Sequence, residues 1–80
     1  MPKTIFTDAN LIVIGALKDE RLRAGIKQAE LAKKIGKDQS WVSLVEGSQR
    51  RVDVVEFIQI AKALGADPID LLRQIIDQME

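Results

Sequence analysis

Apolar side chains recur along this chain at the three- and four-residue spacing of an α-helix. The clearest run follows Asp53, with apolar residues at i, i+3, i+4 and i+7: Phe57, Ile60, Ala61 and Leu64. Sustained alternation of apolar and polar residues, which is typical of strands, is nearly absent, and the chain has no Asn-Gly or Asp-Gly hairpin turn. The pattern therefore predicts an all-α fold.

Cap residues and glycines divide this pattern into five short helices. The first is predicted to begin at Thr7 or Asp8 and to end before Gly25. Its inward stripe is expected to comprise Leu11, Ile14, Leu17 and Leu22. The other helices are predicted over residues 28–35, 39–46, 54–64 and 68–79, bounded by Gly36, Asp38, Asp53, Gly65 and Asp67. Short turns between them predict one compact bundle, so residues 1–80 are expected to form a single domain.

Composition limits the chemistry of this bundle. An 80-residue chain has room for one core, and 46% hydrophobic residues are enough to form it. The chain has no cysteine and no histidine, which excludes a disulfide and the usual zinc sites, so we expect no metal, no cofactor and no enzymatic activity. The longest unbroken apolar stretch, residues 11–14, is too short to span a membrane, and no leader with a cleavage site opens the chain. A cytoplasmic protein without a membrane partner is expected.

The net charge of zero conceals an asymmetry. Residues 1–51 carry ten basic and six acidic side chains, a balance of +4, whereas residues 52–80 carry two basic and six acidic ones, a balance of −4. A basic front and an acidic back would orient the molecule toward a polyanion such as nucleic acid. The alternative explanation is an ordinary solvated surface of mixed charge.

The second and third predicted helices, within residues 28–47, carry the functional signal. The tight turn at residues 36–38 forces a sharp crossing instead of an antiparallel hairpin, and Ala32 is small enough for the point where the helices meet. Val42 and Val45 would anchor the third helix, whose other face then carries Gln39, Ser40, Ser43 and Leu44. Because a short polar helix end fits the major groove, the segment is predicted to be a DNA-binding helix-turn-helix. An ordinary helix pair is the alternative.

Several motifs stand at a regular spacing along residues 11–76. They are residues 28–32 in the second helix, Gly36 in the turn, residues 39–43 at the start of the third helix, Glu46, the basic pair Arg50 and Arg51, and residues 61–65 at the end of the fourth helix. In this combination they resemble the Cro and phage-repressor type of helix-turn-helix, also called the xenobiotic-response-element (XRE) family. The resemblance implies a five-helix, lambda-repressor-like domain that binds duplex DNA, commonly as a dimer.

Three positions depart from the pattern of that family. Relatives usually have glycine where Ser48 stands, and here Gly47 comes one residue early, so the exit turn is expected to differ. Leu44 occupies a position that is often Arg, Lys or Gln in relatives, which weakens the expectation of a polar base contact there. Trp41 replaces what is often a smaller side chain or tyrosine.

Base reading is assigned to the exposed side of the third helix. A glutamine amide pairs bidentately with adenine N6 and N7, which makes Gln39 the first candidate. Ser40 is expected to touch a base or a phosphate, and Ser43 faces the same way one turn on. Leu44 is expected either to pack on a thymine methyl or to be partly buried within the bundle.

Affinity is assigned to groups that flank the proposed groove, because phosphate contacts set position and not sequence preference. The candidates are Lys27, Gln28, Lys37, Trp41, Arg50 and Arg51, with Gln28 at the amide end of the second helix. Trp41 either offers its N–H to a phosphate or covers the junction of the second and third helices. The resemblance also implies a structural salt bridge between Arg21 and Glu46, which joins the first helix to the end of the third.

The C-terminal helix, residues 68–79, has more apolar surface than one core contact needs. Leu71 and Ile75 form one stripe, and a second comprises Ile69, Leu72, Ile76 and Met79. Because a small monomer hides one stripe more easily than two, the second is predicted to be a homodimer contact, joined by Ile5 and Phe6. The alternative is a helix that wraps back over its own core.

These features predict a sequence-specific, double-stranded DNA-binding transcription regulator, a repressor-type homodimer on an inverted-repeat operator. No small-molecule effector is expected, because the sequence offers no effector domain. An antitoxin or a restriction-modification controller of the same fold is an alternative. A protein-interaction module that does not touch DNA is the alternative from another class, and Leu44 and the zero net charge are its best support.

Overall fold

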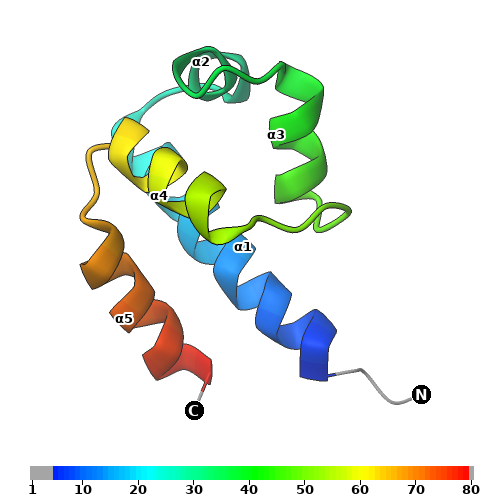
Figure 1. Cartoon of the computed structure of the whole chain (residues 1–80), viewed down its shortest axis with the longest axis vertical. Helices are drawn as coiled ribbons and strands as arrows, with labels where there is room; N and C mark the ends of the chain where they lie inside the picture. Colours follow the sequence, from blue (N-terminus) through cyan, green and yellow to red (C-terminus); the bar gives the residue numbers. More distant parts are fainter. Residues whose placement is uncertain (1–4, 80) are drawn as a thin grey trace.

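The computed structural model describes residues 5–79 of the chain, with side chains from residue 9 onward. Its elements are five α-helices: α1 (Ile5–Ala24), α2 (Gln28–Lys34), α3 (Gln39–Glu46), α4 (Val54–Ala63) and α5 (Pro68–Met79). The predicted all-α fold is confirmed over this part of the chain, and each predicted helix is present (Figure 1). None of these helices is long and apolar enough to cross a membrane.

The helix boundaries agree with the prediction except at three ends. α1 begins at Ile5, so the predicted start at Thr7 or Asp8 is wrong. Threonine and aspartate are tolerated within a first turn, and a favourable cap residue therefore does not force a helix to begin after it. α2 and α4 each end one residue earlier than expected, with Ile35 and Leu64 as their C-caps. The side chains of Ile5 and Phe6, predicted to join a dimer surface, lie outside the described residues.

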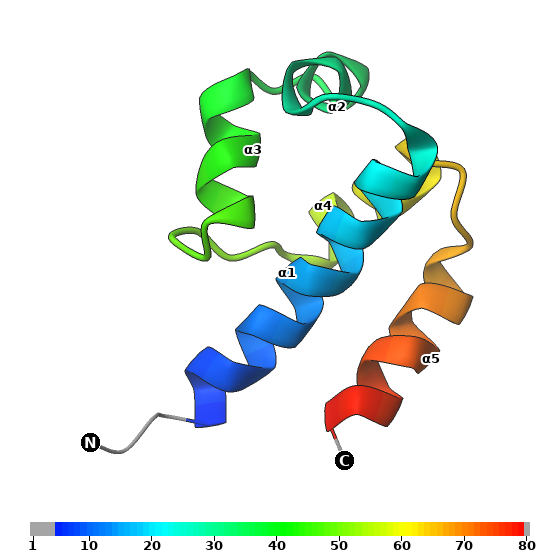
Figure 2. The same ribbon diagram turned by 180° about the vertical axis from the view of Figure 1, so that it is seen from behind.

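The helices form a body of 37 × 26 × 21 Å. α1 and α5 run side by side toward the end that carries both termini, and α2 and α3 form the other end (Figures 1 and 2). α4 lies between these two ends and contacts α1, α2 and α5. The predicted helix-turn-helix and the C-terminal helix thus occupy different parts of the surface.

The core is built from the predicted apolar stripes of all five helices. Its buried members are Leu17, Leu31, Ala32, Val42, Ile60, Ala61, Leu71 and Ile75. Phe57 and Leu64, from the run that follows Asp53, pack partly buried against this cluster. Because α2 and α3 contribute to the same core as α1 and α5, the helix-turn-helix is fixed on the body of the molecule.

The prediction that Leu11 and Leu22 of α1 face inward is wrong, because Leu11 is 48% exposed and Leu22 is 57% exposed. Ile14 and Leu17 define the buried face, and one turn after Leu17 that face reaches Arg21, not Leu22. Leu22 lies about 100° further round the helix and is turned to solvent. A buried arginine, 8% exposed, therefore occupies the place expected for a leucine.

Candidate nucleic-acid interface

The turn between α2 and α3 is built by one glycine and one helix cap. Gly36 has a φ of 73°, which L side chains rarely adopt, and the Lys37 amide donates to the Ala32 carbonyl at 2.9 Å. Asp38 then caps α3, where its Oδ1 accepts from the Trp41 amide at 3.2 Å. Ala32 is 2% exposed, as a close crossing of the two helices requires. The result is the sharp α2–α3 crossing that the turn predicts (Figure 1).

This packing leaves one face of α3 exposed. Val42 and Val45 are buried, whereas the four residues predicted to read bases are exposed together: Gln39, Ser40, Ser43 and Leu44. Leu44 is 42% exposed, which favours a contact with a partner over burial in the bundle. The Ser40 hydroxyl donates to the Asp38 carboxylate at 2.9 Å, which leaves its oxygen free to accept.

A chain of hydrogen bonds links this face to α1. Arg21 donates from Nε and Nη2 to the Glu46 carboxylate at 2.7 and 3.0 Å, and from Nη1 to the Ile26 carbonyl at 2.8 Å. Glu46 also accepts from Gln28 Nε2 at 3.0 Å, and Gln28 Oε1 accepts from Gln39 Nε2 at 3.5 Å. The structure therefore contains the Arg21–Glu46 pair that the resemblance implies, and it connects that pair to Gln39.

Arg21 and Glu46 keep each other charged. Burial raises the pKa of Glu46, but hydrogen bonds from Arg21 and Gln28, with the charges of Arg21 and Lys18, outweigh burial and leave the pKa below its usual value. The hydrogen bond to Glu46 raises the pKa of Arg21 against the opposing effect of burial. The two side chains are only 10% and 7% exposed, so losing either partner would leave a charge shielded from water.

Gln28, predicted to meet a phosphate at the amide end of α2, has a further role that the sequence did not predict. Both ends of its amide are engaged within the protein, with Glu46 and with Gln39. Lys27 is the N-cap of α2 and makes no side-chain cap bond, so this helix end offers a phosphate its backbone amides. No motif marks the bridging role of Gln28, because that role depends on how three helices meet.

Comparison with known proteins connects this geometry to one family. Residues 15–74 match the family model of the helix-turn-helix domain. The solved structure of an XRE-family like protein from Pseudomonas syringae pv. tomato str. DC3000 has a TM-score of 0.87 and 36% identity to this chain, covering 95% of this chain and 93% of its own. No curated protein matches the chain.

Two restriction-modification controllers are also similar. C.AhdI from Aeromonas hydrophila has a TM-score of 0.74 and 32% identity, covering 81% of this chain and 94% of its own. C.Esp1396I, solved as a tetramer in complex with its natural 35-base-pair operator, has a TM-score of 0.79 and 24% identity, covering 89% of this chain and 93% of its own. At that identity the second controller shows a shared fold.

The chain belongs to the XRE-type helix-turn-helix family. It is a DNA-binding transcription regulator of that family, and α2 and α3 are its helix-turn-helix. The family match runs from within α1, through α2, α3 and α4, into α5. This agrees with the resemblance inferred from the motifs at residues 28–32, 39–43 and 61–65.

At the exit from α3, this XRE-type regulator uses serine where a glycine is usual. Ser48 has a φ of 59°, whereas Gly47 has an ordinary φ of −84°. The Ser48 hydroxyl accepts from Asn10 Nδ2 of α1 at 2.9 Å. The exit turn was expected to differ because of Ser48, and in the structure Ser48 takes the left-handed conformation that a glycine adopts easily. The left-handed conformation therefore lies at residue 48 and not at Gly47, although Gly47 is the glycine of this turn.

Trp41 of the regulator lies against the core with two cations over its ring. Lys37 Nζ is 5.1 Å and Arg50 Cζ 5.4 Å from the ring centroid. Nε1 of Trp41 is buried and has no hydrogen-bond partner among the residues that the structure describes. The predicted phosphate contact of Trp41 is therefore not supported, because its polar atom cannot be reached. The alternative, in which the ring covers the α2–α3 junction, fits the structure.

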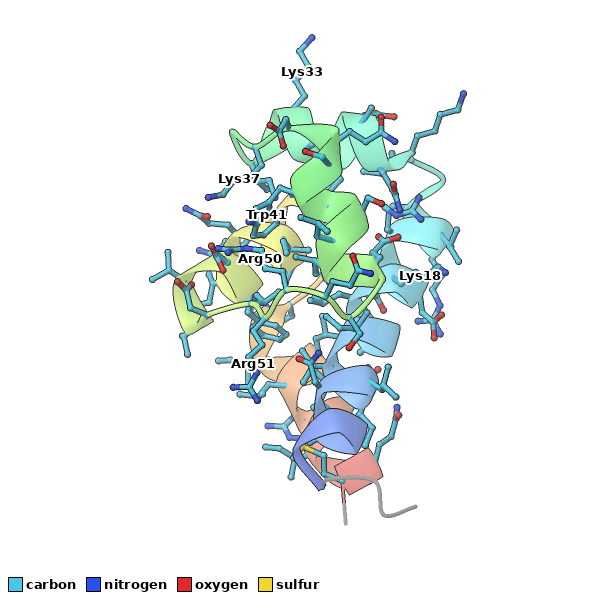
Figure 3. All side chains as sticks on the ribbon, turned by 90° about the vertical axis from the view of Figure 1, so that its right-hand side faces the viewer. Lys18, Lys33, Lys37, Trp41, Arg50 and Arg51 are labelled. Carbon is cyan, nitrogen blue, oxygen red and sulfur yellow. The ribbon has the colours of Figure 1, made fainter. Side chains whose placement is uncertain are left out.

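Basic side chains surround the face of α3. Those labelled in Figure 3 are Lys18, Lys33, Lys37, Arg50 and Arg51. Lys27, Lys37, Arg50 and Arg51 were predicted from the sequence and are all exposed. Lys18 and Lys33 were missed, because no motif marks them and only the packing of α1 and α2 beside α3 brings them to this side.

One acidic side chain that the sequence analysis missed joins this cluster. Glu56 Oε2 lies 3.3 Å from Arg50 Nη2 and 3.9 Å from Lys37 Nζ. Glu56 Oε1 accepts from the Asp53 amide at 3.0 Å, and Asp53 Oδ1 accepts from the Glu56 amide at 2.7 Å, a reciprocal capping box at the start of α4. An aspartate followed three residues later by glutamate is the sequence signal for such a box. Nothing in the sequence around Glu56 predicts its ion pairs with Arg50 and Lys37.

Proposed function

We propose that this regulator is a repressor that binds an inverted-repeat operator as a homodimer, with α3 of each subunit in a major groove. The observation that carries the proposal is the exposed face of α3, which is surrounded by cations and joined to α1 by hydrogen bonds through Gln28 and Glu46. A recognition helix that is already fixed in place loses little conformational freedom on binding.

Gln39 is the principal base-reading residue in this proposal. Its long bond to Gln28 Oε1, at 3.5 Å, restrains the side chain at the start of α3. Its Oε1 and second N–H remain for adenine N6 and N7. Ser40 and Ser43 supply hydroxyl contacts, and Leu44 supplies an apolar surface for a thymine methyl.

Lys27, Lys37, Arg50 and Arg51 bind phosphates in this proposal, and the position of Lys18 and Lys33 in Figure 3 extends the same role to them. Such contacts give affinity to any duplex and set the register of α3. The backbone amides at the start of α2, where Gln28 stands, supply the phosphate contact of that helix.

The homodimer contact is proposed for the exposed stripe of α5. Its members are 47–67% exposed: Ile69, Leu72, Ile76 and Met79. An apolar groove of about 380 Å³ between α4 and α5 shares Ile69 and Leu72 with this stripe, and its lining also includes Val54, Phe57 and Ile58. A ridge next to a groove is self-complementary, because a two-fold axis can seat the ridge of each subunit in the groove of the other.

One subunit makes too few base contacts to give the sequence discrimination that a regulator needs. Each good bidentate base contact discriminates by about 1–3 kcal/mol. A regulator needs roughly 4–10 kcal/mol over non-specific DNA, more than one short helix offers. Two subunits double the readout, with their α3 helices about 34 Å apart on an inverted repeat. The 32% identity to the controller C.AhdI makes control of a restriction-modification system the second candidate function.

In this proposal the regulator is not an enzyme, and it acts in the cytoplasm, where a repressor of this type meets its operator. It needs no cofactor and no small-molecule effector, because binding follows from the helix-turn-helix and from the concentration of the dimer. The neighbouring genes would distinguish the candidate functions: an adjacent nuclease gene favours a restriction-modification controller, and an adjacent toxin gene favours an antitoxin.

Selection of bound sites from a random duplex pool tests the function. We expect enrichment of an inverted repeat whose half-sites lie about one helical turn apart. Gln39→Ala should lose about 1–3 kcal/mol of discrimination at one position of each half-site. Gln59→Ala, on an exposed face of α4, is the matched control and should select the wild-type site. A pool without any enriched sequence would contradict base reading and favour a protein-interaction module.

A further inference from the structure

Glu56 contacts both cations that lie over the Trp41 ring. Its Oε2 is 3.3 Å from Arg50 Nη2 and 3.9 Å from Lys37 Nζ. Arg50 and Lys37 are half-exposed, with 45% and 35% of their side chains accessible, whereas the Glu56 side chain is 12% exposed. One sheltered carboxylate thus faces two cations whose charged groups reach the surface beside α3 (Figure 3).

We propose that Glu56 is an internal competitor of DNA, a counter-anion that limits how strongly Lys37 and Arg50 bind phosphate. The inference rests on the proposed function of these two cations. A phosphate oxygen and the Glu56 carboxylate are acceptors for the same N–H groups. DNA must therefore weaken the pairs with Glu56, or bring a phosphate next to a fixed negative charge.

The geometry favours a competition between Glu56 and phosphate over a role in which Glu56 only holds Lys37 and Arg50 in place. Both contacts are long for charge-assisted hydrogen bonds, which are about 2.7–2.9 Å when strong, so neither cation is held rigidly. The Glu56 carboxylate is held in place independently of them, because its Oε1 accepts from the Asp53 amide at 3.0 Å. The negative charge consequently stays at this site when a phosphate arrives.

Glu56→Gln removes the negative charge of Glu56 and is expected to leave the fold unchanged. Glutamine also completes a capping box, so the start of α4 should be kept. Glu20→Gln is the matched control: Glu20 is 18% exposed and pairs with Arg23 at 3.0 Å on α1, and neither residue belongs to the proposed DNA or subunit contacts. Both variants raise the net charge by the same amount, so a general electrostatic effect should appear in both.

The test is a salt titration of binding to a non-operator duplex. We expect Glu56→Gln to bind about fivefold more tightly than the wild type at low salt, because two partly exposed ion pairs that compete with phosphate are removed. Its slope of log K against log salt should be steeper by about 1 per subunit, and Glu20→Gln should stay near the wild type. Equal behaviour of the two variants, or weaker binding by Glu56→Gln, would overturn the proposal.

Elution from phosphocellulose separates this inference from the proposed function. Glu56→Gln should elute at higher salt than Glu20→Gln even if neither protein reads DNA, because the matrix presents phosphate groups alone. Later elution without any binding to DNA would leave the competition intact and refute the operator function. Normal binding to DNA with identical elution of the two variants would refute the competition and leave the operator function intact.

Discussion

Ser48 combines two opposing effects in one residue. Its φ of 59° is a left-handed conformation that costs an L residue about 1–2 kcal/mol. Its hydroxyl accepts from Asn10 Nδ2 at 2.9 Å, and a hydrogen bond of this kind contributes about 1 kcal/mol. The near balance explains how serine is tolerated at the exit of the recognition helix, where the bond also ties the exit turn to α1.

Substitutions at Ser48 should separate these effects. Ser48→Ala keeps the strain and loses the bond, so it should lower the free energy of unfolding by about 1–2 kcal/mol. Ser48→Gly loses the bond but relieves the strain, so it should stay within about 1 kcal/mol of the wild type. Urea unfolding measures both. Asn10→Ala is expected to lose about as much as Ser48→Ala, and an alanine variant as stable as the wild type would show that the bond contributes nothing.

At the residue scale, the sequence predicts burial or exposure correctly where it depends only on a residue's position within its helix. The exposure of Gln39 and Ser43 and the burial of Val42 follow from the period of α3. The side-chain contacts of Gln28 and Glu56 were not predicted, because their partners lie in other elements and chain spacing carries no information about such contacts.

At the scale of elements, one buried ion pair sets the orientation of the recognition helix. Arg21 belongs to the buried face of α1, and Glu46 is the last residue of α3. Their bidentate contact therefore fixes the C-terminal end of α3 against α1, while the Asp38 cap and the turn fix its N-terminal end. The helix is held at both ends, and Gln39 and Ser40 of its exposed face join these contacts through Gln28 and Asp38.

Arg21→Ala should weaken both folding and DNA binding. It leaves Glu46 charged and 7% exposed, which should cost about 3 kcal/mol of unfolding free energy. Binding should weaken about tenfold, equivalent to about 1.4 kcal/mol, because the end of α3 is no longer fixed. A melting curve and a DNA titration measure the two effects. Arg23→Ala, whose side chain is 73% exposed in its pair with Glu20, is the control and should change neither.

The same pair makes stability depend on pH. The pKa of Glu46 is lower in the folded protein than its ordinary value of 4.5. Its contribution to stability is therefore complete above the ordinary value and is lost as the pH falls through the folded value. The difference in unfolding free energy between the wild type and Glu46→Gln should be constant above about pH 5 and should shrink below it. A difference that does not change between neutral and acid pH would contradict the role of the charge.

The existence of each helix could be predicted from the sequence, and some boundaries could not. α3 has the predicted bounds, because Asp38 caps its start and its apolar period stops at Glu46. The start of α1 was misplaced, because two acceptable cap residues, Thr7 and Asp8, lie inside the helix. The conformation of the exit turn needed the structure, since serine at residue 48 does not by itself predict a positive φ.

At the scale of the whole molecule, the charge asymmetry of the chain follows the fold. The basic part, residues 1–51, comprises α1, α2 and α3, and the acidic part, residues 52–80, comprises α4 and α5. The helix-turn-helix and its cations therefore lie on the basic part, and the exposed apolar stripe lies on the acidic part. This arrangement favours approach to DNA with α3 leading.

DNA binding should accordingly depend steeply on salt. If each subunit neutralises about three phosphates, the dimer should show a slope of log K against log salt of roughly −5. Replacing Arg51 with alanine should make the slope less steep by about 1 per subunit and should weaken operator and non-operator duplexes alike. Fluorescence anisotropy at several salt concentrations gives the slope. Binding that is flat from low to moderate salt would contradict the groove model.

The subunit contact decides whether two recognition helices can act together. Leu72→Glu combined with Ile76→Glu places charges on the exposed apolar stripe, at positions 47% and 48% exposed. Because these side chains are not core residues, the variant should fold, sediment as a monomer and bind a half-site weakly. Gln74→Glu with Gln78→Glu adds the same charge to the opposite side of α5 and should remain dimeric.

Each outcome bears on a different step of the mechanism. If the stripe variant remains a dimer in sedimentation, α5 is not the interface and the stripe has another use. If the wild type binds a single half-site as tightly as a full inverted repeat, dimerisation adds nothing to recognition. The expected result is a joint loss, because a monomer keeps about half of the base contacts and half of the phosphate contacts. Its salt slope should then fall to about half of the dimer value.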